Sequence, residues 1–110
     1  MIRDISIVIP IYNEEDNILQ LIKEVRAALE KKINYEIIIV DDGSDDNSYE
    51  VVNKIKKISK NINIISHKKN YGQSIGLRTG IIEANNEYIV TLDGDGQNDP
   101  KDIPTLIKSF

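Results

Sequence analysis

The sequence alternates between two kinds of apolar pattern, and this alternation limits the possible folds more than any other feature. Each short run rich in β-branched residues is followed by a stretch whose apolar residues have helical spacing or whose residues are typical of a helix start. The expected strands are residues 5–11, 35–40, 61–66 and 87–92. One helix is expected between the first two strands, and three more are expected after residue 46, at residues 73–84 and from residue 99. Strands that alternate with helices predict an α/β fold with a mostly parallel, Rossmann-like sheet and flanking helices.

The first two expected helices have clear apolar stripes. The segment 13–16 resembles a helix start, with Asn13 as its cap and three acids near the positive end of the helix dipole. The stripe that follows consists of Ile18, Leu21, Ile22, Val25, Ala28 and Leu29. The second helix is expected to turn inward the side chains of Val51, Val52, Ile55 and Ile58.

Glycines recur every four residues at Gly72, Gly76 and Gly80. On a helix they would leave a bare face that can pack closely on a neighbour. The same spacing occurs in membrane helices, but the intervening polar residues disfavour that interpretation; they are Gln73, Ser74, Arg78 and Glu83.

Composition excludes several functional classes. The chain has 110 residues, a length that suits one domain, and a net charge of −4 with 5% aromatic residues disfavours a nucleic-acid partner. It has no cysteine, which excludes disulfides and thiolate metal sites. The apolar runs are strand-sized, so we expect none to span a membrane, and the chain moves straight into an expected strand, so we expect no signal peptide. The sequence stops inside the last expected helix, so we expect residues 1–110 to be part of a longer protein.

Three polar clusters follow expected strands. They are residues 10–14, 41–44 and 93–97. In open α/β sheets, ligands bind at the carboxyl ends of the strands, so the three clusters are expected to gather along one edge and form a site there.

The third cluster has the chemistry of a metal site. The carboxylates of Asp93 and Asp95 and the amide oxygen of Gln97 are ligands that suit Mg²⁺ or Mn²⁺. The alternative is an ordinary acidic turn. A calcium-binding EF-hand loop fits poorly, because its sixth position would be Asn98 and its twelfth Pro104.

The other two clusters leave alternatives open. Asp41 and Asp42 either accept hydrogen bonds from the base or ribose of a ligand, or turn the chain and cap a helix. Tyr12 either stacks beneath a base or closes the edge of the sheet. Glu14 fits a first-turn acid better than a ligand contact.

Three basic residues and the single histidine are expected at the surface. Lys68, Lys69 and Arg78 fit solvated charges better than phosphate ligands. His67 has no visible partner in the sequence, so we interpret it as a surface residue after the third strand.

The three clusters, together with Asn70-Tyr71-Gly72-Gln73, resemble the leading motifs of family 2 glycosyltransferases with the GT-A fold. The segments that carry the resemblance are Val8 to Glu14, Val40 to Ser44 and Leu92 to Pro100. The branch that looks most similar is the polyprenyl-phosphate glycosyltransferases, which include enzymes similar to dolichyl-phosphate mannose synthase. The resemblance covers essentially the whole chain.

The resemblance implies a nucleotide-sugar donor site. Pro10, Tyr12, Glu14, Val40 and Asp42 would line the nucleoside pocket, with Asp41 as a further candidate. Asp93 and Gly94 would lie beside the ribose and diphosphate, and Asp95 and Gln97, with Asp93, would hold Mg²⁺ or Mn²⁺. Asp93 and Asp95 would thereby be the catalytic residues of this half.

The resemblance also implies the reaction. A metal-dependent transfer from a UDP- or GDP-sugar would invert the anomeric centre, and the acceptor would be a polyprenyl phosphate or a glycan. The acceptor-binding half, and any peripheral membrane contact, would lie in sequence beyond residue 110. Residues 1–110 alone would therefore be inactive or weakly active, and the whole protein would act at the cytoplasmic face of the membrane.

Three other functions fit parts of the sequence pattern. A phosphorylated receiver domain would carry its acid pair after the first strand, whereas Asp41 and Asp42 follow the second. A nucleotidyltransferase would carry a glycine-rich basic loop where residues 12–15 stand. A nucleotide-binding module without transfer activity stays the main alternative.

Overall fold

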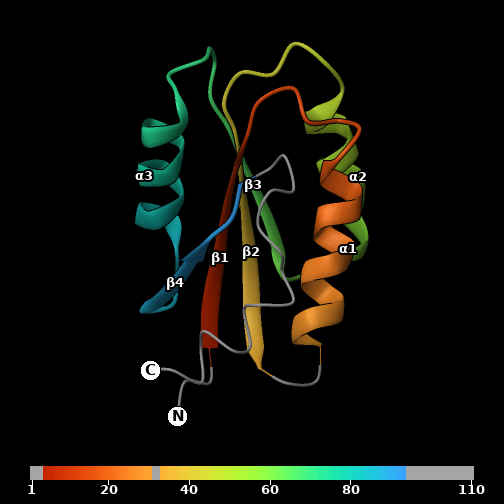
Figure 1. Cartoon of the computed structure of the whole chain (residues 1–110), viewed down its shortest axis with the longest axis vertical. Helices are drawn as coiled ribbons and strands as arrows, with labels where there is room; N and C mark the ends of the chain where they lie inside the picture. The colour runs from red at the N-terminus through yellow and green to blue at the C-terminus, as the bar shows by residue number, and fades with distance from the viewer. Residues whose placement is uncertain (1–3, 31–32, 94–110) are drawn as a thin grey trace.

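A four-stranded parallel sheet in the order β3-β2-β1-β4 forms the centre of the chain (Figure 1). The structure is a computed structural model that describes residues 4–30 and 33–93. Its elements are β1 (Asp4–Ile11), α1 (Ile18–Leu29), β2 (Asn34–Asp41), α2 (Ser48–Ile58), β3 (Ile62–Ser66), α3 (Gln73–Glu83) and β4 (Tyr88–Thr91). The predicted α/β class and the four strands are confirmed. The helix expected from residue 99 lies outside the described residues.

The register of the sheet determines which loops meet. β1 pairs with β2 as far as Ile11 opposite Asp41, and β2 pairs with β3 as far as Asp41 opposite Ser66. These three strands therefore end at one level. β4 pairs with β1 over residues 88–91, and the amide of Leu92 donates to the carbonyl of Val8. The residues after all four strands consequently face the same edge.

The two faces of the sheet are covered differently. Figure 1 shows α1 and α2 on one side of the sheet and α3 on the other. Because side chains alternate along a strand, the odd residues of β1 enter the larger core under α1 and α2, whereas Val8 enters the smaller core on the α3 side. The smaller core contains three buried residues, Val8, Ile38 and Val40.

α3 approaches the sheet through its glycines. A methyl group on Gly80 would overlap the side chain of Val8, and one on Gly76 would lie 3.1 Å from the Cβ of Pro10. The predicted bare face is therefore confirmed at these two positions. Gly72 differs, because it has open space around it and a φ of 100°, and it precedes the first residue of the helix. Its role is to turn the chain into α3.

Two predictions about the helices were wrong. α1 begins at Ile18, and Asn13 does not cap it, because Asn13 has a φ of 54° and contacts the loop after β2 instead. Ile58 is 84% exposed at the end of α2, whereas Val52 and Ile55 are buried as expected. Within the described ranges, no helix is both long and apolar enough to cross a membrane.

Candidate functional site

The loops after β1 and β2 are joined through Asn13. The Oδ1 atom of Asn13 accepts hydrogen bonds from the amides of Asp45, at 2.8 Å, and Asp46, at 3.3 Å. The amide of Asn13 in turn donates to the Oγ of Ser44 at 2.9 Å. Asparagine is one of the few residues that tolerates a left-handed backbone conformation, so this side chain fits the position. The contact fixes the two loops against each other.

A second contact between these loops is built on buried Ser48. Its hydroxyl accepts a hydrogen bond from the amide of Glu14 at 2.9 Å and donates to Asp46 Oδ1 at 2.6 Å. Asp46 also accepts from the amides of Glu15 and Ser48. Burial alone would raise the pKa of Asp46, but these hydrogen bonds outweigh it and lower the pKa below its usual value.

Glu14 lies before α1 and not in its first turn. Its carbonyl accepts from the amides of Asn17 and Ile18, and its carboxylate accepts from the Asn17 side chain at 3.0 Å. The interpretation of Glu14 as a first-turn acid is therefore wrong. The left-handed conformation of Asn13 bends the chain directly before Glu14, and the helix begins four residues later, at Ile18.

Asp41 and Asp42 are both buried but have different partners. Asp41 Oδ1 accepts from the amide of Ser44 at 2.9 Å, which stabilises the turn. Asp42 instead contacts the segment after β3: its carboxylate accepts from the amides of Tyr71, at 3.0 Å, and Gly72, at 2.8 Å. Asp41 thus has the turn-forming role, whereas Asp42 connects β2 to the start of α3.

His67 is a partner of Asp42, so its interpretation as a surface residue without a partner was wrong. The Nδ1 atom lies 2.8 Å from Asp42 Oδ1, and Nε2 lies 2.9 Å from Thr79 Oγ1 on α3. The sheet register explains the contact, because Asp41 pairs with Ser66 and the following residues are neighbours. The amide of His67 also donates to the Asp41 carbonyl at 2.8 Å.

The surroundings of Asp42 favour its ionised form. Burial by itself would raise its pKa, but the hydrogen bond from His67 and the amides of Tyr71 and Gly72 together hold the pKa below its usual value. Asp42 is therefore an anion at neutral pH.

The same turn reaches the third cluster. The side-chain amide of Gln73, the first residue of α3, donates to Asp93 Oδ1 at 2.9 Å. Residues 71–73 thus contact both Asp42, after β2, and Asp93, after β4. Nearby, the Lys69 ammonium lies 5.6 Å from the centre of the Tyr71 ring.

The predicted site residues that the structure describes lie along the carboxyl edge of the sheet. They are Pro10, Tyr12, Glu14, Val40, Asp41, Asp42 and Asp93. Pro10 pairs with Val40, and Tyr12 is 42% exposed with its hydroxyl 3.3 Å from Asp45. Gly94, Asp95 and Gln97 lie outside the described residues, so the metal-binding set stays a prediction, as does the nucleotide-binding role of the others.

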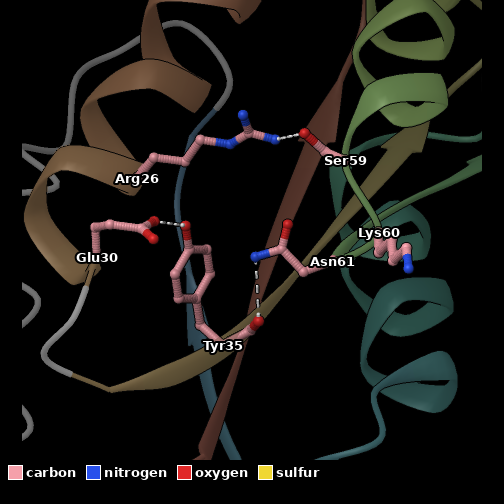
Figure 2. Close-up of a pocket in the computed structure, with 6 residues that line it drawn as sticks. All are labelled: Arg26, Glu30, Tyr35, Ser59, Lys60 and Asn61. Atoms are coloured by element: carbon pink, nitrogen blue, oxygen red, sulfur yellow. Dashed lines mark hydrogen bonds between the residues drawn. The ribbon is translucent and has the colours of Figure 1, made fainter.

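A pocket of about 350 Å³ lies at the opposite, amino-terminal edge of the sheet (Figure 2). Its lining residues are Arg26, Glu30, Tyr35, Ser59, Lys60 and Asn61. Figure 2 shows that most of its polar groups pair with one another: Arg26 with Ser59, the Tyr35 hydroxyl with Glu30 at 3.2 Å, and Asn61 with the Tyr35 carbonyl at 3.4 Å. These polar groups are satisfied within the protein.

Sequence reasoning missed three residues of the carboxyl edge, namely Ser48, His67 and Thr79. Each contacts a residue that is distant in the sequence, and its role depends on strand order and register. Ser48 had a local signal, since serine near a helix start commonly accepts hydrogen bonds from backbone amides. His67 and Thr79 had none.

The chain belongs to glycosyl transferase family 2, whose family model matches residues 6–110. Its similarity to curated members of the polyprenyl-phosphate branch extends over nearly its whole length. It is 41% identical over 110 residues to an undecaprenyl-phosphate 4-deoxy-4-formamido-L-arabinose transferase of Photorhabdus laumondii, covering 98% of this chain and 34% of that protein. It is 39% identical to a dodecaprenyl-phosphate galacturonate synthase of Rhizobium johnstonii, covering 97% of this chain and 32% of that protein. The chain spans about a third of the length of these relatives.

Solved structures confirm the predicted fold. The TarS protein of S. aureus (residues 1–349) superposes with a TM-score of 0.81 at 22% identity, over 96% of this chain and 31% of that chain. The mannosyltransferase PcManGT of Pyrobaculum calidifontis, in complex with GDP-Man and Mn²⁺, gives a TM-score of 0.78 at 20% identity, over 86% of this chain and 28% of that chain. At these identities the likeness defines the fold alone.

Proposed function

We propose that this chain is the donor-binding half of a metal-dependent, inverting glycosyltransferase. The observation that carries the proposal is the meeting of Asp42 and Asp93 at one edge of the sheet, both held by residues 71–73. Membership of glycosyl transferase family 2 supports a nucleotide-diphosphate sugar, with UDP or GDP, as the donor.

In this proposal the carboxyl edge binds the nucleoside. Asp42 is ionised and accepts a hydrogen bond from the base or ribose, while exposed Tyr12 offers a ring for stacking. Glu14 completes the pocket together with the backbone of Pro10, Val40 and Asp41, whose side chains are buried. The Asn13 and Ser48 contacts keep the two loops rigid, which lowers the entropy lost on binding.

The third cluster would hold the metal and the diphosphate. Asp95 and Gln97, with Asp93, offer oxygen ligands suited to Mg²⁺ or Mn²⁺, and Gly94 leaves room for the ribose and diphosphate. When bound, the metal supplies positive charge that stabilises the leaving nucleoside diphosphate. Gln73 orients Asp93 for this role through its hydrogen bond.

The acceptor is proposed to be a polyprenyl phosphate. Two curated relatives are named for undecaprenyl and dodecaprenyl phosphate, which supports a lipid phosphate over a glycan. A phosphate nucleophile is already anionic, so attack on the face of the sugar opposite the leaving group needs no general base from this half. The acceptor site would lie in sequence that the relatives have and this chain does not, and the whole protein would work at the cytoplasmic face of the membrane.

The test is a calorimetric titration of UDP and of GDP, each with Mn²⁺ and with EDTA. It is made on this chain, on Asp95→Ala, and on Asp16→Ala, which removes an exposed acid before α1. We expect one nucleotide to bind in a metal-dependent manner, Asp95→Ala to lose that binding and Asp16→Ala to keep it. Binding that is independent of metal and of Asp95 would contradict the metal-dependent site.

Transfer activity separates the enzyme from a module that only binds the nucleotide. We expect the full-length protein to release UDP or GDP from a nucleotide sugar when a polyprenyl phosphate is added. Nucleotide binding without any release, in the full-length protein, would favour the binding module.

A further inference from the structure

The Asp42–His67–Thr79 chain of hydrogen bonds links the end of β2 to α3, and neither the family motifs nor the predicted site includes its last two members. We propose that His67 is a positioning residue for donor binding, which acts by fixing the Asp42 carboxylate. The proposal rests on the proposed function of Asp42 as the carboxylate that contacts the nucleoside.

The acceptor sites of Asp42 are mostly used within the protein. A carboxylate offers about four acceptor positions, two on each oxygen. Oδ1 accepts from His67 Nδ1 at 2.8 Å and from the Tyr71 amide at 3.0 Å, and Oδ2 accepts from the Gly72 amide at 2.8 Å. By this count the remaining acceptor position is on Oδ2 and would contact the nucleoside, and the orientation of the carboxylate determines where it points.

His67 is, among the described residues, the one side chain that donates to Asp42, since the other two donors are backbone amides. Those amides belong to the turn into α3. His67 belongs to the end of β3, so it holds the carboxylate from a second direction. Without it, the carboxylate would be held only from the side of the turn, by one amide on each oxygen.

The His67 ring is itself held in place. Thr79 Oγ1 lies 2.9 Å from Nε2, and the Tyr71 ring contacts the imidazole edge-on, with centroids 5.4 Å apart and planes at 82°. The single hydroxyl proton of Thr79 can serve either Nε2 or the Ile75 carbonyl, which lies 3.0 Å from Oγ1. Nδ1 donates to Asp42 in either case, because an ionised carboxylate can only accept.

Two amide substitutions separate the two contacts of the ring. The side-chain nitrogen of asparagine can occupy the place of Nδ1, so His67→Asn can keep the bond to Asp42 and loses the one to Thr79. The nitrogen of glutamine can occupy the place of Nε2, so His67→Gln can keep the bond to Thr79 and loses the one to Asp42. Both replace an imidazole by a neutral amide, which makes them a matched pair.

The experiment measures the dissociation constants of UDP and GDP with Mn²⁺ by calorimetry, on the full-length protein and on both variants. For the nucleotide that binds the unaltered protein, we expect His67→Gln to weaken binding about tenfold and His67→Asn to stay within about threefold. Both variants are expected to stay folded at the temperature of the titration, although His67→Gln loses the stronger bond, the one to an ionised carboxylate. Melting curves of both variants check this.

The other outcomes overturn the proposal in distinguishable ways. If His67→Gln binds as tightly as the unaltered protein, or if both variants weaken equally in proportion to lost thermal stability, His67 has only a structural role. If the folded, unaltered protein binds neither nucleotide, the proposed donor site itself fails, and the role of His67 fails with it.

Discussion

The two ends of the sheet both carry polar side chains, but they use them differently. At the amino end, Glu36 accepts from Ser6 and from the amide and side chain of Asn85, which closes the bend between α3 and β4 onto the sheet. At the carboxyl end, Asp42 accepts from His67 and from two backbone amides, which uses three of about four acceptor positions.

The difference separates a structural cluster from the proposed donor site. Glu36 and its partners satisfy one another, and so do most of the polar groups of the pocket in Figure 2. At the carboxyl end, carboxylates and Asn13 hold backbone amides of loops that meet from different strands. Such loops are rigid before any ligand arrives, and rigidity of this kind favours binding.

The largest expected effect is that of Asp42→Asn. Loss of the charge weakens three hydrogen bonds, and the new NH₂ group faces N–H donors with which it cannot form a hydrogen bond. We therefore expect the free energy of unfolding to fall by about 2–4 kcal/mol. Donor binding should weaken more than tenfold in the same variant. Urea unfolding and calorimetry measure the two quantities.

The matched control at the other end is Glu36→Gln. It makes the same change from carboxylate to amide in a half-exposed position, so we expect a loss of about 1 kcal/mol of stability and unchanged nucleotide affinity. Equal losses of nucleotide affinity in both variants would remove the functional distinction between the two ends.

Gly80→Ala tests the helix that connects both ends. The added methyl overlaps Val8, so we expect a loss of about 1–3 kcal/mol, although alanine favours a helix over glycine. Gly76→Ala is the control: its methyl lies 3.1 Å from Pro10 Cβ, and the change should stay within about 1 kcal/mol of the native stability. Thermal unfolding of the two variants gives the comparison, and equal stabilities would contradict the close packing of α3.

The smallest effect is an acid dependence that both ends share. The pKa values of Asp42 and Asp46 at the carboxyl end, and of Glu36 at the amino end, are lowered, because hydrogen bonds to the ionised groups outweigh burial. A lowered carboxyl pKa adds stability that is present above the unfolded-state value of about 4 and is lost as the pH falls through the folded-state value.

We therefore expect the free energy of unfolding to fall between about pH 5 and pH 2. Asp42→Asn and Glu36→Gln should each reduce the dependence of this free energy on pH, because each removes one of the three carboxyl groups. Urea unfolding across this pH range measures the dependence. If neither variant changes the dependence, the lowered pKa values are contradicted.

The strands could be predicted from the sequence because their signal is local. The run from Ile5 to Ile11 is continuous enough to require burial on both faces, and the same holds for residues 37–40. The glycine face of α3 was predictable for the same reason. In contrast, the left-handed conformation of Asn13, which prevents it from capping α1, is stabilised by a loop more than 30 residues away.

The meeting of the loops could be predicted from the sequence, but the contacts between them could not. The rule that ligands bind at the carboxyl ends of parallel strands predicted that residues 10–14, 41–44 and Asp93 lie along one edge. It did not place His67 beside Asp42, because that contact follows from the β2–β3 register, which the sequence does not specify. The same rule could not distinguish Asp41, which forms a turn, from Asp42, because both are aspartates at the end of the same strand.

The most direct test of the central claim is to map nucleotide binding by ¹H–¹⁵N nuclear magnetic resonance with UDP or GDP and Mg²⁺. The account predicts metal-dependent shifts of the amides of Tyr12, Asp42 and Gly72 at the carboxyl end, with Arg26, Tyr35 and Asn61 at the amino end unchanged. Shifts confined to the amino-end pocket, in a folded protein, would contradict the proposed donor site.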